Sequence, residues 1–108
     1  MEKLNIYLSV NLIEEYKSEF EFAIVFRNEN GQHVYQSINC DYTELKEDET
    51  DVYEFMDNLL LYLTNSKEIN QLLNSYTNWE EFDTDFMNTN YQVVINAFTK
   101  YMQERQKN

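Results

Sequence analysis

The stretch that decides the fold is residues 20–40, which read FEFAIVFRNENGQHVYQSINC. Its first part alternates apolar and other residues with period two, which predicts a strand. The apolar positions of that strand are Phe20, Phe22, Ile24 and Phe26. The polar run 28–32 contains the only Gly of the chain in an Asn-Gly pair, which is typical of a hairpin turn. A second alternation over 33–40 then predicts the returning strand.

A further strand is expected before this hairpin, over residues 4–12. One side of it is apolar throughout and the other is mostly polar, the pattern of a half-buried strand. The apolar positions are Leu4, Ile6, Leu8, Val10 and Leu12. Residues 14–18 are polar and indicate a turn. We therefore expect a three-stranded antiparallel meander. On its central strand, the face opposite the Phe positions begins acidic and ends apolar, so we expect that face to become covered towards Phe26.

The period changes after the third predicted strand. Residues 41–50 are polar and acidic, and Thr50 is a plausible N-cap for a helix that runs to Leu63. That helix carries a broad apolar stripe. Its members are Val52, Phe55, Met56, Leu59, Leu60 and Leu63.

Three more helical segments complete the prediction. Ser66 is expected to cap a short helix, and Thr77 with Glu80 forms a capping-box pattern before a segment with Trp79, Phe82 and Phe86 on one face. A last helix is expected over about 90–105. The sequence thus predicts one α+β domain over residues 1–108, with three strands followed by three or four helices packed on one face.

The composition excludes several classes of function. The chain has 108 residues and a net charge of -12, from eight Lys and Arg against 20 Asp and Glu. Such a chain lacks the cations that neutralise nucleic-acid phosphates, and an anionic membrane would repel it. The charge suggests either solubility or a basic partner.

The compartment is predicted from smaller signals. No apolar run is long enough to span a membrane, and the first residues lack a signal-peptide pattern. The lone Cys40 fits a reducing compartment. The many Asn, Tyr, Ile and Phe residues suggest AT-rich codons. We therefore expect a protein that is encoded by a low-GC bacterium or its phage and is located in the bacterial cytoplasm.

Most of the surplus acids gather in two clusters, and a smaller surplus lies between residues 14 and 29, where five Glu face Lys17 and Arg27. The first spans residues 41–57 and comprises Asp41, Glu44, Glu47, Asp48, Glu49, Asp51, Glu54 and Asp57. The second comprises Glu80, Glu81, Asp83 and Asp85. Tyr42 and Tyr53 flank the first cluster and are aromatic candidates for a contact surface. Water and salt can screen such charges, so a solvated face is one reading. The other is that the carboxylates imitate phosphates and occupy a basic groove.

Residues for catalysis or cofactor binding are scarce. His33 and Cys40 differ in strand parity and are expected on opposite faces, which argues against a nucleophile and base pair. Two such residues cannot make a zinc site, and one Gly cannot supply a phosphate-binding loop. We expect no enzyme, no metal and no cofactor.

Two stretches resemble those of small acidic phage proteins that inhibit bacterial defence nucleases, in particular anti-CRISPR inhibitors of type II-A Cas9. One is the hairpin from Arg27 to Tyr35, and the other is the acidic-aromatic segment from Trp79 to Met87. The resemblance implies that acidic side chains occupy the Arg and Lys pocket that reads the DNA motif beside the target. Here the acids of residues 80–85, or those of 41–57, would do so. The first strand and the long last helix depart from that pattern.

The sequence therefore predicts a phage or mobile-element inhibitor that binds the basic groove of a defence nuclease, with Cas9 favoured, through clustered carboxylates. The alternative is a small acidic interaction or regulatory protein that catalyses nothing. In that alternative the apolar helix faces make the contact with the partner, and the partner can be a second copy of the chain in a homodimer.

Overall fold

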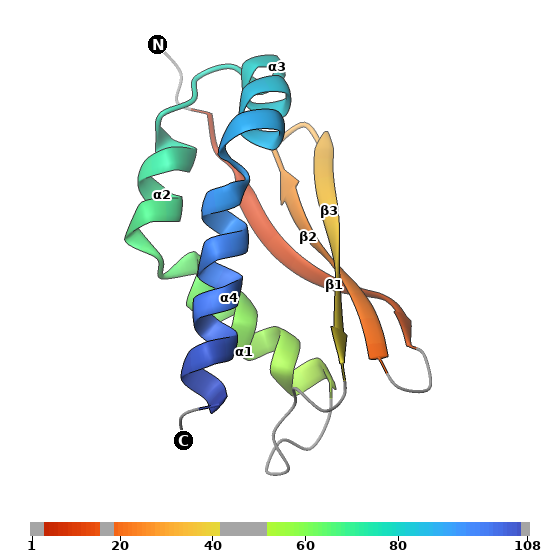
Figure 1. Cartoon of the computed structure of the whole chain (residues 1–108). Coiled ribbons are helices and arrows are strands. Elements are labelled where there is room, and N and C mark those ends of the chain that lie inside the picture. The colour runs from red at the N-terminus through yellow and green to blue at the C-terminus, as the bar shows by residue number, and fades with distance from the viewer. Residues whose placement is uncertain (1–3, 16–18, 42–51, 107–108) are drawn as a thin grey trace.

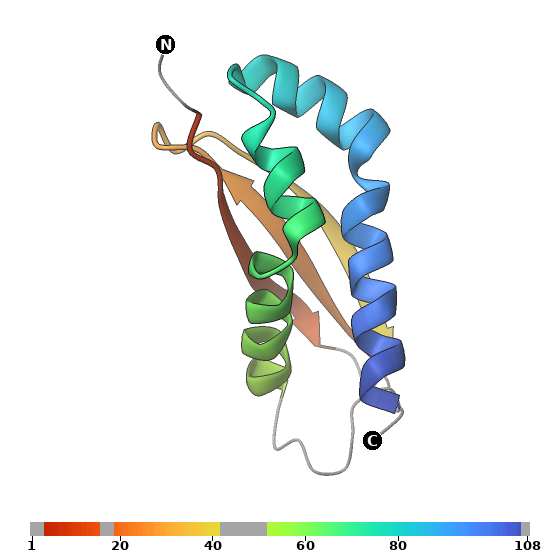
Figure 2. The same cartoon turned by 90° about the vertical axis from the view of Figure 1, so that its left-hand side faces the viewer.

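The computed structural model describes residues 4–15, 19–41 and 52–106. It has the expected α+β architecture, a three-stranded antiparallel sheet followed by helices that lie on one of its faces (Figures 1 and 2). The elements are β1 (Tyr7–Glu15), β2 (Glu19–Arg27), β3 (His33–Asp41), α1 (Val52–Thr64), α2 (Lys67–Asn74), α3 (Trp79–Glu81), the π-helix η2 (Phe82–Asn90) and α4 (Gln92–Gln106).

The sheet has the order β1-β2-β3, so β2 is central and both neighbours are antiparallel to it. The predicted limits of the first strand were wrong. It begins at Tyr7 rather than residue 4, and it continues through the expected turn to Glu15. A register shift between Leu12 and Glu14 allows this, because a bulge takes up one extra residue without ending the pairing.

The hairpin between β2 and β3 confirms the predicted turn. Gly31 adopts a φ of 84°, a value that other residues rarely reach. The buried Asn28 side chain organises the loop, since its Oδ1 accepts from the N–H groups of Asn30 and Gln32, both at 3.0 Å. The Asn28 N–H donates to the Gln32 carbonyl at 3.0 Å and closes the hairpin.

The helices begin close to where the sequence places them, but one cap and the winding of one segment differ from the prediction. Ser66 caps α2 as expected, with its Oγ accepting from the Ile69 N–H at 3.3 Å. The cap of α3 is Asn78 and not Thr77, because the Asn78 Oδ1 accepts from the Glu81 N–H at 3.1 Å. The π-helical winding of η2 was also not expected. Thr50, the predicted cap of α1, lies outside the described residues.

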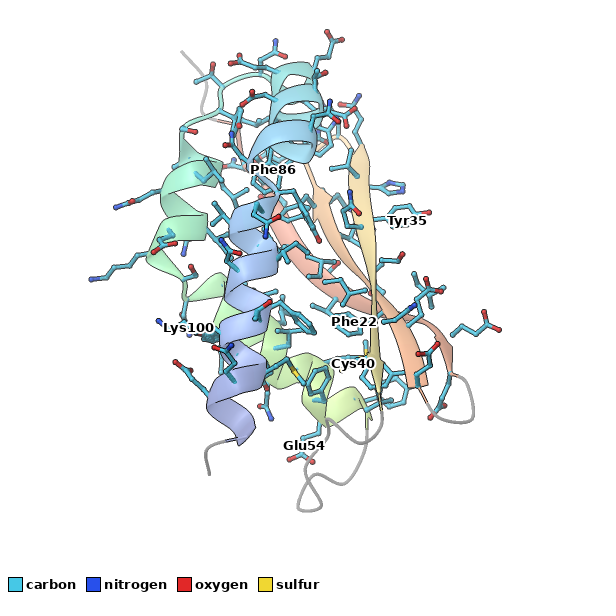
Figure 3. The ribbon with its side chains drawn as sticks, in the orientation of Figure 1. Phe22, Tyr35, Cys40, Glu54, Phe86 and Lys100 are labelled. Atoms are coloured by element: carbon cyan, nitrogen blue, oxygen red, sulfur yellow. The ribbon has the colours of Figure 1, made fainter. Side chains whose placement is uncertain are left out.

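The core lies between the sheet and the helices and is rich in aromatic rings (Figure 3). Phe22 packs on Phe55 of α1 at 6.0 Å between ring centroids, and Phe26 packs on Phe82 and Phe86 at 5.8 and 5.1 Å. Edge-to-face and offset contacts of this kind favour a fixed geometry. The two ends of β2 thus anchor different helices.

The other face of the sheet has no described helix over it (Figures 1 and 2). Val25 is nevertheless buried there, with Ser9 and Tyr35 as its cross-strand partners. The prediction that this face becomes covered towards Phe26 therefore holds for Val25, although the cover that the structure describes is sheet rather than helix. Arg27, the last residue of β2, is exposed.

Candidate functional site

The structure describes the side chains of seven of the fourteen candidate contact residues. Tyr53, Glu54 and Asp57 lie on α1, Glu80 and Glu81 on α3, and Asp83 and Asp85 on η2. All seven are exposed. Asp41 ends β3, and nothing is described of its side chain. The other candidates lie outside the described residues, namely Tyr42, Glu44, Glu47, Asp48, Glu49 and Asp51.

On α1 the acids share the helix with a stripe that is buried in the core. Phe55 and Leu59 are fully buried, and Glu54 and Asp57 are exposed beside the 61% exposed ring of Tyr53. Glu54 belongs to the first helical turn, where the helix dipole favours a negative charge. The amphipathic pattern read from the sequence is therefore what exposes these side chains.

On α3 and η2 the acids are presented by a firmly packed element. Phe82 and Phe86 are fully buried and stack on each other at 4.7 Å, and the Trp79 ring lies 5.1 Å from that of Phe82. Glu80 and Glu81 are in the first turn, near the positive end of the dipole. Buried rings on one side leave Glu80, Glu81 and Asp83 in water on the other.

Asp85 differs from its neighbours because it belongs to a hydrogen-bond network. The Tyr76 hydroxyl donates to Asp85 Oδ2 at 2.6 Å, and Asn90 Nδ2 donates to the same oxygen at 3.1 Å and to the Tyr76 hydroxyl at 2.8 Å. Burial raises the pKa of Tyr76, and the hydrogen bond to the Asp85 carboxylate raises it further. The Asp85 carboxylate therefore ties η2 to the segment before α3.

The structure does not bring the two clusters together. Glu54 lies at one end of the molecule and Phe86 of η2 near the other, as the labels of Figure 3 show. The molecule measures 48 × 26 × 21 Å along its principal axes. The described acids of the two predicted clusters therefore lie at opposite ends of a rod, and not on one surface.

Acids that were not among the candidate contact residues also lie at both ends. Glu29 in the β2–β3 turn lies at the same end as α3 (Figures 1 and 2). At the α1 end, Glu14 is paired with Glu21, and Glu19 with Asp41, on the face away from the helices. Strand parity hinted at Glu19 and Glu21, but the opposition of Glu14 to Glu21 depends on the bulge in β1.

The apolar helix faces of the alternative reading are mostly used in the core. Among the described helical residues, the large apolar or aromatic side chains that are strongly exposed are Tyr53 and Leu61, each at 61%. Leu61 lines a cavity of about 600 Å³ between α1, the start of α2 and α4. The wall also carries Lys67, Lys100 and several amide side chains, so its chemistry is mixed rather than apolar.

Two searches of the described residues complete the inventory. No three His, Cys, Asp or Glu residues within them come together in a way that could hold a metal ion. None of the described helices is long and apolar enough to cross a membrane.

Comparison of the chain with protein-family models, with curated proteins and with solved structures found no match.

Proposed function

We propose that this protein binds, without catalysis, the basic nucleic-acid-binding groove of another protein, and that its favoured target is a Cas9-type nuclease of bacterial defence. The observation that carries the proposal is the placement of Glu80, Glu81 and Asp83. These three carboxylates are exposed within four residues of one another, and no described Lys or Arg forms an ion pair with them.

Rigidity supports a role in binding. The Asn78 cap, the buried Phe82 and Phe86 rings and the Tyr76–Asp85 hydrogen bond hold the backbone that presents these acids. A surface that is ordered before binding loses less conformational entropy when the partner arrives. Arginine side chains in a nucleic-acid groove can donate paired hydrogen bonds to carboxylates as they do to phosphates.

The shape of the molecule supports the same proposal. Duplex DNA carries one negative charge per about 1.7 Å of its axis and rises about 3.4 Å per base pair. The 48 Å rod is therefore as long as about 14 base pairs, and it is acidic at both ends. A groove that follows a duplex could contact both acidic ends, whereas a short pocket would take only one.

The test is inhibition of DNA cleavage by purified Cas9 loaded with guide RNA, titrated with this protein. We expect inhibition near one equivalent. The variant Glu80→Gln/Glu81→Gln/Asp83→Asn should need about tenfold more protein, since each lost contact with a basic groove contributes roughly 0.5 kcal/mol. A matched control, Glu15→Gln/Glu68→Gln/Glu104→Gln, removes the same charge away from α3 and should inhibit more strongly than the α3 variant.

A second variant tests the acidic cluster outside the described residues. Reversing Glu47, Asp48, Glu49 and Asp51 to Lys should abolish inhibition if that cluster makes the contact. Comparison with the α3 variant then assigns the binding end. Equal inhibition by the parent and by both variants would contradict the proposal.

If Cas9 is not inhibited, the target is wrong and the groove is tested separately. The protein and its α3 variant are used as baits in bacterial lysate, with elution by a salt step. A nucleic-acid-handling protein that the parent captures and the variant does not would keep the groove proposal with a new target. Capture that ignores the variant would overturn the groove proposal as well.

A further inference from the structure

The outer edge of β3 is an exposed strand edge that nothing described in the structure covers. β3 is the last strand in the order β1-β2-β3, and its register with β2 is unbroken from His33 to Asp41. Natural edge strands are commonly protected by Pro, Lys or a bulge. β1 has a bulge, between Leu12 and Glu14, whereas the nine residues of β3 contain none of these devices.

The hairpin fixes which backbone groups of β3 point outwards. The bond from the Asn28 N–H to the Gln32 carbonyl makes this a hydrogen-bonded position, and such positions alternate along an antiparallel ladder. The pairs of His33, Tyr35, Ser37 and Asn39 with β2 are therefore the non-hydrogen-bonded ones. Their N–H and C=O groups point away from β2, towards the outer edge.

The two ends of this strand have cross-strand partners of opposite charge on β2. His33 is paired with Arg27 at one end, and Asp41 with Glu19 at the other. Within one copy the second pair sets acid against acid, which is unfavourable. When this strand runs antiparallel to a copy of itself, the end that lies beside Arg27 comes next to the acidic end of the copy.

We propose that two copies of this chain pair antiparallel through β3, with Ser37 on the two-fold axis, to form a six-stranded sheet. This register sets His33 opposite Asp41 of the second copy and Tyr35 opposite Asn39. Arg27 and His33 of one copy then share a row with Asp41 and Glu19 of the other. A shift by two residues would lose this match, so charge complementarity selects the register.

The pairing is also consistent with the inner face. It sets Val34 opposite Cys40 of the second copy and Gln36 opposite Ile38, on the side that carries the helices. Val34 and Ile38 are only half-buried in the single chain, so a neighbouring strand would remove more of their apolar surface from water. This inference does not rest on the proposed function, because the exposed acids of α3 lie on another surface.

The first test is disulfide trapping with Ser37→Cys under mild oxidation. A hydrogen-bonded pair has its Cα atoms about 5.5 Å apart. A disulfide can bridge that distance. Asn39→Cys is the control, because in this register its copies are offset by four residues, roughly 13 Å along the strand. We expect covalent dimer for Ser37→Cys and none for Asn39→Cys. The reverse result, or trapping of neither, would overturn the proposal.

The second test measures mass in solution by sedimentation over a range of protein concentration. Ser37→Pro removes an N–H that points to the outer edge and leaves the bonds to β2 in place. It should sediment as a single chain where the parent and Ser37→Ala sediment as dimers. A parent that is a single chain at every concentration would overturn the dimer. If the parent is a single chain and Ser37→Pro stops it from binding a target protein, a segment of that target, and not a second copy, occupies the edge.

Discussion

The hydroxyl of Tyr76 donates a 2.6 Å hydrogen bond to Oδ2 of Asp85, nine residues further along the chain. Tyr76 is buried and its ring packs on Phe82 and Phe86, whereas Asp85 is exposed. The bond therefore joins the segment before α3 to the acidic side of η2. It is one reason why the neighbouring carboxylates have a fixed backbone.

Removal of this hydroxyl should destabilise the fold. In Tyr76→Phe the ring contacts remain but the charge-assisted bond is lost, so the free energy of unfolding should fall by about 1.5 kcal/mol. Urea unfolding followed by circular dichroism measures this. Asn90 still donates to Asp85 in the variant, so a loss much above this value would contradict the description of the network.

Tyr91 should respond in the opposite direction. Its side chain is 8% exposed, and its hydroxyl has no hydrogen-bond partner among the described residues. A buried hydroxyl without a partner is unfavourable, so Tyr91→Phe should raise the free energy of unfolding by about 1 kcal/mol. The same urea experiment checks it, with Tyr76→Phe as the contrasting variant. A loss of stability would show that the Tyr91 hydroxyl has a partner after all.

The two tyrosines also predict loss of stability in alkali. Burial raises the pKa of both Tyr76 and Tyr91 above the ordinary value of 10.0. The folded chain therefore holds these protons more tightly than the unfolded chain does. Their contribution is fully present below pH 10.0 and is lost as the pH rises towards the raised values.

Urea unfolding between pH 8 and 11 follows this loss. In the double variant Tyr76→Phe/Tyr91→Phe the decline should be shallower than in the parent, because the remaining seven tyrosines are common to both. Parallel declines in the two proteins would mean that other groups cause the alkaline instability.

The acidic residues on the sheet face away from the helices predict that one charge reversal stabilises the fold. Glu14 and Glu21 are cross-strand partners, and like charges at that position repel. Glu21→Lys should raise the free energy of unfolding by about 0.5 kcal/mol at low salt. The gain should shrink in 1 M salt, where the screening length is about 3 Å. A gain that is equal at both salt concentrations would not be electrostatic.

Most of the fold could be predicted because its signals are local. The alternation of Phe20, Phe22 and Phe26 predicted the central strand, and Ser66 predicted the start of α2. Gly31 is needed for the φ of 84° in the turn. Each of these features follows from a few neighbouring residues, so pattern and turn chemistry are sufficient to find it.

The errors arose where distant contacts decide the outcome. β1 continues to Glu15 because a bulge keeps it paired with β2, and no pattern within β1 shows this. Asn78 and Thr77 are both good caps, and the structure selects Asn78. The separation of the two acidic clusters likewise depends on how the helices cross the sheet, so sequence spacing alone could not reveal it.

The π-helical winding of η2 bears on how this chain tolerates changes in length. Each bond in such a helix reaches one residue further back than in an α-helix, so a π-helical turn holds a residue more than the α-helical form needs. Deletion of one residue between Asp83 and Asn90 should let the segment rewind as α-helix while both of its ends stay anchored. A one-residue deletion that would disrupt α1 or α4 is therefore expected to be tolerated here, and it would turn the acidic side chains about the helix axis.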